Sequence, residues 1–249
     1  MVAVLDAWLD LVHGSRCVGC STPGRLLCRG CAAVLPRSAV PVRPTPCPDG
    51  LAPCWAAGEY ADLLRALVLA HKERRAFALA RPLGHVLAGV VAGIPGPAGT
   101  GGRTLELLVP VPSRPDVVRA RGHDPMLRIA RAAASELRRD GRPVRVSRLL
   151  RQRVPMGDQS GLGHAERAAN LHDSLAVAPG PLRATARLGR PVVAVVCDDV
   201  LTTGATAREA QRGLEDVGVP VAAVGCVAAT RKRNAGPAPS SLPFSTQAD

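Results

Sequence analysis

The apolar residues of this chain follow two periodicities. Runs rich in β-branched residues, typical of buried strands, alternate with stretches in which apolar residues recur every three or four positions, as on one face of a helix. The strand-like runs span residues 105–113, 144–150, 192–197 and 221–228, and the helix-like stretches span 61–73, 74–93, 125–139 and 205–216. A strand–helix–strand rhythm requires a parallel sheet with right-handed crossovers. The pattern therefore predicts an α/β fold with flanking helices.

Four of the eight cysteines form two CxxC pairs. Cys17 and Cys20 are followed, after seven residues, by Cys28 and Cys31. Two such turns can present four thiolates to one tetrahedral ion, which is the ligand set of a closed structural zinc site. A segment this small has no core of its own, so metal binding would supply most of its folding energy. Disulfides and a redox CxxC motif are the alternatives, and a zinc ribbon is the interpretation that we favour.

The other four cysteines do not repeat this spacing. Cys47 and Cys54 lie in a proline-rich stretch with six residues between them. A second metal site and two free thiols are both open for this pair, and free thiols are favoured. Cys197 and Cys226 lie inside strand-like runs, where a cysteine behaves as a small buried hydrophobic residue.

These features divide the chain into four segments. We expect an amphipathic helix and the zinc ribbon in residues 1–35, followed by a proline-rich linker, or an arm packed over the main domain, in 36–58. The main domain spans 59–233, with a further helix expected from His164, and the tail, 234–249, has few apolar residues and is predicted to be disordered. No uncharged run approaches the ~20 residues of a membrane span, so we expect a cytoplasmic protein.

The formal net charge of +12 is carried almost wholly by arginine. A basic surface suits phosphorylated ligands or nucleic acid. The chain is equally rich in alanine, glycine, proline and valine, which indicates a general compositional bias, and its aromatic content of 2% offers no platform for stacked bases. The charge is therefore weak evidence for DNA binding.

The most specific motif follows the run at 192–197. Two carboxylates, Asp198 and Asp199, precede a Thr/Gly loop and then an alanine-rich segment of helical character. A loop at a helix N-terminus offers backbone amides and a favourable dipole to an anion, and glycine permits the close approach that a phosphate needs. Carboxylates repel phosphate but accept hydrogen bonds from sugar hydroxyls, so the pattern indicates a ribose phosphate. The candidate loop residues are Thr202, Thr203, Gly204, Ala205 and Thr206. The alternative is an ordinary turn in which Asp199 or Thr202 caps the helix.

At these residues the chain resembles the type I phosphoribosyltransferases, whose ligand loop has the order strand, Asp-Asp, Thr-Thr-Gly-x-Thr, helix. Over residues 15–233 it resembles the ComF family, in the order CxxC ribbon, AHKERRAFALARPLG, VPVPSRPDVVRARGHD, DQSGLGHAERAANL, Asp-Asp loop and VAAT. The resemblance implies a type I phosphoribosyltransferase-like sheet with an N-terminal four-cysteine zinc ribbon. It also implies binding of phosphoribosyl pyrophosphate with Mg²⁺, or of a nucleoside monophosphate, in which Asp198 and Asp199 act as the catalytic residues by positioning the ribose.

The resemblance extends to the segment after the run at 105–113. Its counterpart in the family is the pyrophosphate loop, which assigns Ser113 and Arg114 to the leaving pyrophosphate. Arg119 and Arg121 follow closely, and guanidinium groups bind phosphate oxygens bidentately. The alternatives are a proline-rich turn that only ends a strand and a solvated basic loop.

Two classes of function remain at this stage. The first is a phosphoribosyltransferase that transfers the phosphoribosyl group to an acceptor that the sequence does not identify. No paired general acid and base stands out, which fits a reaction that depends on positioning and on Mg²⁺ at the departing pyrophosphate. The second is a non-catalytic competence accessory that supports DNA uptake and binds single-stranded DNA or a helicase partner, as the family association implies. A redox protein built on the CxxC pairs is a third, weaker alternative.

Overall fold

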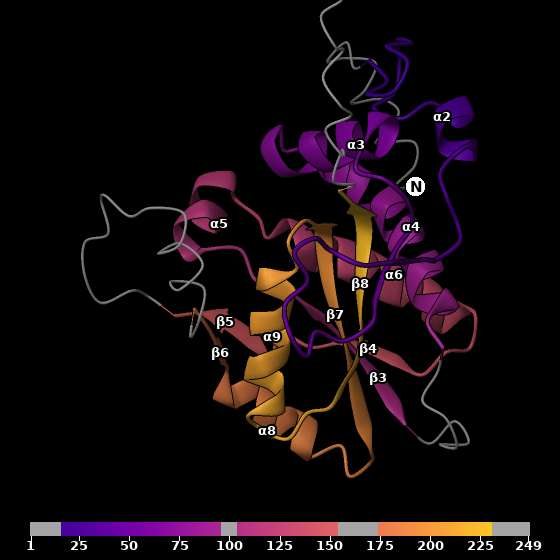
Figure 1. Cartoon of the computed structure of the whole chain (residues 1–249). Coiled ribbons are helices and arrows are strands. Elements are labelled where there is room, and N and C mark those ends of the chain that lie inside the picture. Colours follow the sequence, from indigo (N-terminus) through magenta and orange to yellow (C-terminus); the bar gives the residue numbers. More distant parts are fainter. Residues whose placement is uncertain (1–15, 96–103, 154–173, 231–249) are drawn as a thin grey trace, which may run out of the picture.

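The computed structural model describes residues 16–95, 104–153 and 174–230 (Figure 1). The amphipathic helix expected before the CxxC pairs, the helix expected from His164 and the predicted disordered tail lie outside these residues. No helix of the described ranges is long and apolar enough to cross a membrane.

A six-stranded sheet forms the centre of the molecule, in the order β1-β2-β8-β7-β3-β4. All neighbouring strands are parallel except β1 and β2, which are antiparallel. The predicted α/β class with a mostly parallel sheet is thus confirmed. The strands are β1 (Val40–Val42), β2 (Cys54–Ala56), β3 (Leu105–Pro110), β4 (Val144–Val146), β7 (Val192–Leu201) and β8 (Val221–Ala229).

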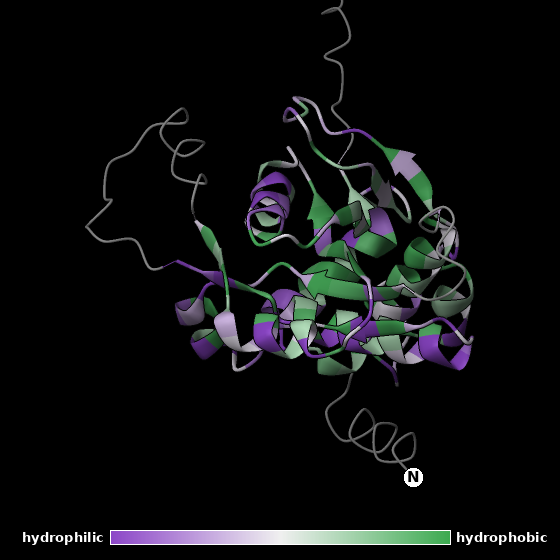
Figure 2. Cartoon of the chain, turned by 90° about the horizontal axis from the view of Figure 1, so that it is seen from below, coloured by the Kyte–Doolittle hydropathy of each residue, from purple (hydrophilic) through white to green (hydrophobic). Residues whose placement is uncertain are grey.

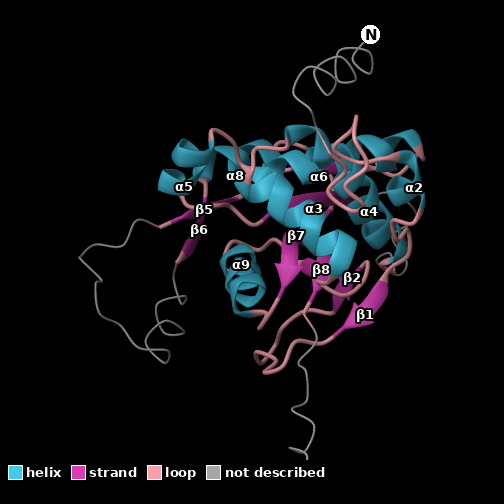
Figure 3. Cartoon of the chain, turned by 90° about the horizontal axis from the view of Figure 1, so that it is seen from above, coloured by secondary structure: helices cyan, strands magenta, loops and turns pink. Residues whose placement is uncertain are grey.

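Helices cover both faces of this sheet, and for this reason its central strands are apolar on both sides. Every residue of β3 is buried, and so is the run from Val193 to Cys197 in β7. Figure 3 shows α9 on one side of the strands and the other helices on the opposite side. The covering helices are α3 (Asp62–Glu73), α4 (Ala80–Gly93), α6 (Pro125–Arg139) and α9 (Ala205–Glu215). Two hydrophobic clusters, one on each face, form the core.

Helix α6 spans the same residues, 125–139, that the periodicity of the sequence predicted. α6 begins at the predicted residue because Pro125 occupies its first turn and the Asp124 carboxylate accepts a hydrogen bond from the Leu127 amide at 3.1 Å. It lies close against α4, where a Cβ on Gly84 would stand 2.4 Å from the Cβ of Ala132. In Figure 2 the strands are predominantly hydrophobic, and hydrophilic residues gather on the surrounding helices.

Residues 36–58 are part of the sheet rather than a linker. β2 pairs in parallel with β8, and β1 extends the sheet beyond β2. Prolines interrupt the apolar pattern in this segment, and three-residue strands are too short to show a period. These strands could therefore not be predicted from the sequence. The alternative, an arm packed over the main domain, is correct for residues 44–52, which lie on α9.

The structure also adds elements that the sequence pattern did not predict. The strand expected at 144–150 is divided into β4 and β5 (Leu150–Gln152), and β5 forms a separate antiparallel pair with β6 (Leu175–Val177). The helical stretch expected at 74–93 is divided into the 3₁₀ helix η1 (Phe77–Leu79) and α4. The additional helices are α2 (Arg29–Ala33), α5 (Pro115–Arg121) and α8 (Pro179–Ala186). All are short, so they carry too few residues to display a period.

Candidate functional site

The topology of the sheet has a switch point between two of its central strands, and the region outside their carboxyl ends is called the crevice below. β3 and β7 are neighbours, with Pro110 opposite Cys197. From β3 the chain continues through α6 to β4 on one side, and from β7 it continues through α9 to β8 on the other. The connections therefore diverge at this point, and in open α/β sheets ligands bind outside the carboxyl ends of the strands at such a switch point.

Asp198 and Asp199 lie at this crevice. The sequence predicted that the strand ends before them, but β7 continues to Leu201 because it remains paired with β8 as far as Ala229. The other neighbour, β3, has already ended opposite Cys197. The two carboxylates thus belong to a strand that is covered on one edge and open on the other.

The environment of Asp198 opposes its ionisation. Burial, and then the neighbouring Asp199 charge, raise the pKa of the Asp198 carboxyl to about 8, although its Oδ1 accepts a hydrogen bond from the Asp199 amide at 2.8 Å. The raised pKa means that ionising Asp198 costs more free energy in the folded protein than in water. A group that supplies hydrogen bonds to Asp198 would offset this cost, and sugar hydroxyls are such groups.

Lys72 is a site residue that the sequence analysis missed. Its Nζ lies 2.7 Å from Asp199 Oδ2, and the Asp199 side chain is only 14% exposed. Burial lowers the pKa of Lys72, but attraction to Asp199 outweighs burial and raises it overall. The two residues are 127 positions apart, so no local pattern could have joined them. The available signal was that Lys72 is one of only two lysines in an arginine-rich chain.

The loop after β7 has the backbone geometry expected of a phosphate-binding turn. Gly204 has a φ of 73°, in the left-handed region, and is the N-cap of α9. No side chain caps this helix, so the alternative in which Asp199 or Thr202 serves as the cap is wrong. Thr203 Oγ1 lies 3.4 Å from the Ala205 amide, and Thr202 and Thr203 are exposed. The Ala205 amide thus has a weak acceptor in Thr203, and the following amides of the first turn have no side-chain cap.

Residues 44–52 pack over the start of α9 and fix the position of this loop. A Cβ on Gly204 would stand 2.9 Å from both Pro44 Cγ and Leu51 Cδ2. Further along the helix, Arg208 Nε donates to the Asp49 carbonyl at 3.0 Å, and Gln211 Oε1 accepts from the Ala52 amide at 2.8 Å. A cavity of about 670 Å³ opens beside the loop. It is lined by Val40–Thr45, Gly58, Glu59, Leu201, Thr202, Thr203, Ala229 and Thr230.

The four pyrophosphate candidates follow β3, in the turn after this strand and in α5, and they differ in their partners. Ser113 is half-buried in the turn after β3, and exposed Arg114 pairs with Asp116 at 3.2 Å. Arg121 donates to Glu73 of α3 at 2.7 Å. Arg119 is exposed and has no acidic partner among the described residues. Of the three arginines, Arg119 alone is thus a guanidinium that an incoming anion can take without displacing a carboxylate.

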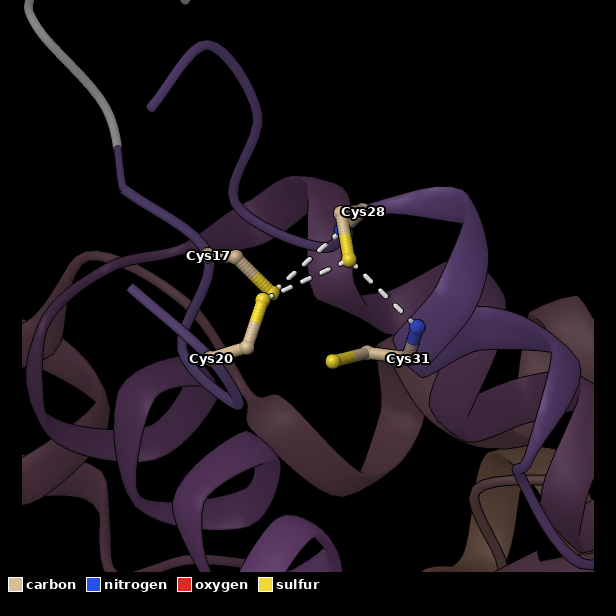
Figure 4. A group of neighbouring side chains, drawn as sticks. All are labelled: Cys17, Cys20, Cys28 and Cys31. Atoms are coloured by element: carbon tan, nitrogen blue, oxygen red, sulfur yellow. Dashed lines mark hydrogen bonds between the residues drawn. The ribbon is translucent and has the colours of Figure 1, made fainter. Parts of the chain in front are cut away.

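The two CxxC pairs meet in space, as Figure 4 shows. The four thiol sulfurs all lie within 4.8 Å of one another, and Cys20 Sγ is 3.6 Å from Cys28 Sγ. A tetrahedral ion with ligands at about 2.3 Å requires sulfurs about 3.8 Å apart, so the cluster can hold a structural metal such as zinc. Burial raises the pKa of Cys17, but backbone amides, first that of Cys28, outweigh burial and lower it to about 6. The neighbouring thiols, first that of Cys28, raise the pKa of Cys31 to about 12. The amide hydrogen bonds thus favour a thiolate at Cys17, and a bound cation would have to stabilise the thiolate of Cys31.

The cysteine cluster is anchored to the α/β domain. A Cβ on Gly19 would stand 2.6 Å from Leu63 Cδ1 of α3 and 2.9 Å from Cys31 Sγ. Cys47 and Cys54 do not join this cluster or another group of metal ligands among the described residues. The Cys54 thiol is buried and donates to the Ala52 carbonyl at 3.3 Å. Cys197 and Cys226 are fully buried, as their apolar surroundings predicted.

Comparison with known proteins does not assign the chain to a family. No family model matches the chain, and a search of curated proteins found no match.

Proposed function

We propose that this protein is a phosphoribosyltransferase-like member of the ComF family and binds phosphoribosyl pyrophosphate with Mg²⁺, or a nucleoside monophosphate. One observation carries the proposal. Paired carboxylates and an uncapped Thr/Gly loop stand together at the carboxyl end of β7, at the switch point of a parallel sheet. A nucleotide-sized anion with a sugar is the ligand that this combination of groups recognises.

The groups divide the ligand between them. The amides of residues 203–206 and the dipole of α9 bind the 5′-phosphate. Asp198 and Asp199 accept hydrogen bonds from the ribose hydroxyls, since carboxylates are acceptors and would repel the phosphate. Lys72 offsets part of the negative charge of this pair, so that a highly anionic ligand can approach the crevice.

The same arrangement supports transfer of the phosphoribosyl group. The bond between the anomeric carbon and the pyrophosphate oxygen breaks as a bond to the acceptor nucleophile forms, and the pyrophosphate leaves with the bonding electron pair. Ser113 and Arg119, on the β3 side, bind the leaving group, and the β7 side holds the ribose in place. Mg²⁺, which arrives with the ligand, supplies neutralisation of the pyrophosphate charge. The acceptor is the part of the reaction that the site does not specify.

The cysteine cluster completes the proposal as a structural zinc site. Four thiols within 4.8 Å, supported by backbone amide donors, form a closed ligand set that leaves no position for a substrate. The residues around it bury little surface of their own, and their contact with α3 links the metal to the α/β domain. Zinc would thus hold residues 17–31 against the helix that carries Lys72.

Calorimetric titration of the zinc-loaded protein with phosphoribosyl pyrophosphate and Mg²⁺ tests the proposal. We expect micromolar binding that an Asp198→Asn/Asp199→Asn variant loses. An Asp62→Asn/Asp140→Asn variant removes the same charge from two exposed positions and should retain it. Absence of binding by the folded wild-type protein would contradict the proposal and favour the non-catalytic alternative.

A further inference from the structure

A second hollow lies at the outer edge of the sheet, away from the Asp-Asp loop. It has a volume of about 260 Å³ and is bounded by the first half of α6, the end of edge strand β4 and α8. Its lining residues are Leu127, Arg131, Arg145, Val146, Ser147, Arg148, Pro181, Ala184 and Thr185. None of them belongs to the site described above.

The charge of this lining is entirely positive. Arg131 comes from α6, and Arg145 and Arg148 come from the end of β4 and the residues after it. None of the three has an acidic partner within residues 16–95, 104–153 and 174–230. No lining residue carries a carboxylate. Like charges brought to one hollow repel each other, and an arginine cannot relieve the repulsion by losing its proton. An anion bound between the guanidinium groups would relieve it.

The remaining lining supplies apolar surface and one free hydroxyl. Leu127, Val146 and Pro181 are the larger apolar residues of the lining. The Thr185 hydroxyl already donates to the Pro181 carbonyl at 3.0 Å. The Ser147 hydroxyl has no such partner within the described residues and can donate to an anion.

We infer that this hollow is a binding site for the di- or triphosphate group of a compact phosphorylated ligand. Guanidinium groups bind phosphate oxygens bidentately, and three of them match the charge of a pyrophosphate group. A hollow of this volume accommodates such a group but not an extended strand. The lining also has no aromatic side chain on which nucleic-acid bases could stack. The inference is independent of the proposed function.

The general arginine content of the chain does not explain this arrangement. A compositional bias distributes guanidinium groups over the surface, where many form ion pairs, as Arg114, Arg121, Arg142, Arg208 and Arg212 do. It does not bring three unpaired guanidinium groups and a free hydroxyl to one hollow. The convergence, rather than the number of arginines, points to a ligand.

The test is calorimetric titration with pyrophosphate, carried out without Mg²⁺ in an Arg119→Gln/Gly204→Ala background, which weakens the phosphate-binding groups of the Asp-Asp site. Adding Arg131→Gln, Arg145→Gln and Arg148→Gln should weaken binding more than about tenfold, since three charge-assisted hydrogen-bond donors are lost. The matched control carries Arg65→Gln, Arg138→Gln and Arg139→Gln, which remove the same charge from exposed positions outside the hollow, and should bind as before. Equal weakening in both variants, or no binding before the arginines are changed, would overturn the inference.

A second measurement keeps the inference testable if the triple variant does not fold. Phenylglyoxal modifies accessible arginines, and mass spectrometry of the wild-type protein identifies which ones react. Pyrophosphate should protect Arg131, Arg145 and Arg148 and leave Arg138 and Arg139 reactive. Protection of the three by a single-stranded oligonucleotide, with none by pyrophosphate, would contradict a compact ligand and indicate a nucleic-acid backbone instead.

Discussion

The cysteine cluster and the Asp-Asp crevice are assembled in opposite ways. The four cysteines span 15 residues, and two tight turns bring their sulfurs together. The crevice joins β7, the turn after β3 and the end of α3, and its ion pair connects residues 127 positions apart. The first site depends on local spacing, and the second depends on the topology of the whole sheet. A substitution in the cluster should therefore have a strong and local effect on metal binding. A substitution in the crevice should act through packing and charge on stability and ligand binding.

The largest effect should come from breaking the cluster. Cys17→Ser removes one of four thiolates, so we expect zinc content to fall from one ion per chain to nearly none. The melting temperature should fall with it, because a ligand at a thousandfold excess over its Kd contributes about 4 kcal/mol. Atomic absorption and thermal unfolding measure the two quantities. Cys47→Ser is the control and should retain the metal, since Cys47 lies outside the cluster. Equal metal loss in both variants would contradict this assignment.

The next largest effect tests whether the loop at Gly204 requires its left-handed backbone conformation. Gly204→Ala forces an alanine into a φ of 73° and places its Cβ 2.9 Å from Pro44 and Leu51. We expect a loss of about 1–3 kcal/mol of unfolding free energy and a marked loss of ligand binding. Chemical denaturation measures the unfolding free energy, and calorimetry measures ligand binding. Gly180→Ala, in α8 with open space around it, should be neutral or slightly stabilising. A Gly204→Ala variant as stable as wild type would show that the loop is not held as described.

Because of Asp198, the free energy of unfolding of the protein should decrease as pH rises. Burial and Asp199 raise the folded-state pKa of Asp198 from 3.8 to about 8, so the folded protein binds the extra proton between these values. Its contribution to stability is fully present below pH ~4 and is lost as pH rises through about 8. Asp198→Asn, which has no charge to bury, should exceed wild type in stability by about 1–3 kcal/mol at pH 8 and not at pH 4. Urea denaturation at both pH values measures this, with Asp140→Asn as a control that shows no such dependence.

A smaller effect tests the long-range connection to α3. Lys72→Met keeps the aliphatic stem but leaves Asp199 without its partner, and we expect a cost of about 1 kcal/mol because the lysine side chain is 35% exposed. A double-mutant cycle with Asp199→Asn isolates the pair from other effects of each change. Additive changes would mean that the ion pair contributes nothing. Arg65→Met, on the same helix and exposed, is the matched control.

The same comparison explains which features could be predicted from the sequence. The CxxC spacing determines the cluster almost alone, and periodicity located α6 and the central strands because these elements are long and buried. The loop at Gly204 was predictable because glycine, threonine and paired aspartates are adjacent in the chain. Strands β1 and β2 were not predictable, since three residues among prolines show no period.

Features that depend on tertiary contacts could not be predicted in the same way. Lys72 reaches Asp199 only because α3 packs near the carboxyl end of β7, and a helical pattern does not reveal which strand end it faces. Likewise Arg121 was predicted to bind pyrophosphate, but in this structure it pairs with Glu73. The arginine hollow was hidden for the opposite reason, because arginines are so frequent in the chain that no three of them stand out.

The central claim is that a ribose-phosphate ligand occupies the crevice between β3 and β7, and hydrogen exchange with mass spectrometry tests it most directly. Phosphoribosyl pyrophosphate with Mg²⁺ should slow exchange at residues 198–210, above all at the amides of 203–206, and at residues 111–121, which form the turn after β3 and α5. Exchange in the cysteine cluster should not change. Protection confined to the cluster, or no protection at 203–206 under conditions in which calorimetry detects binding, would contradict the account.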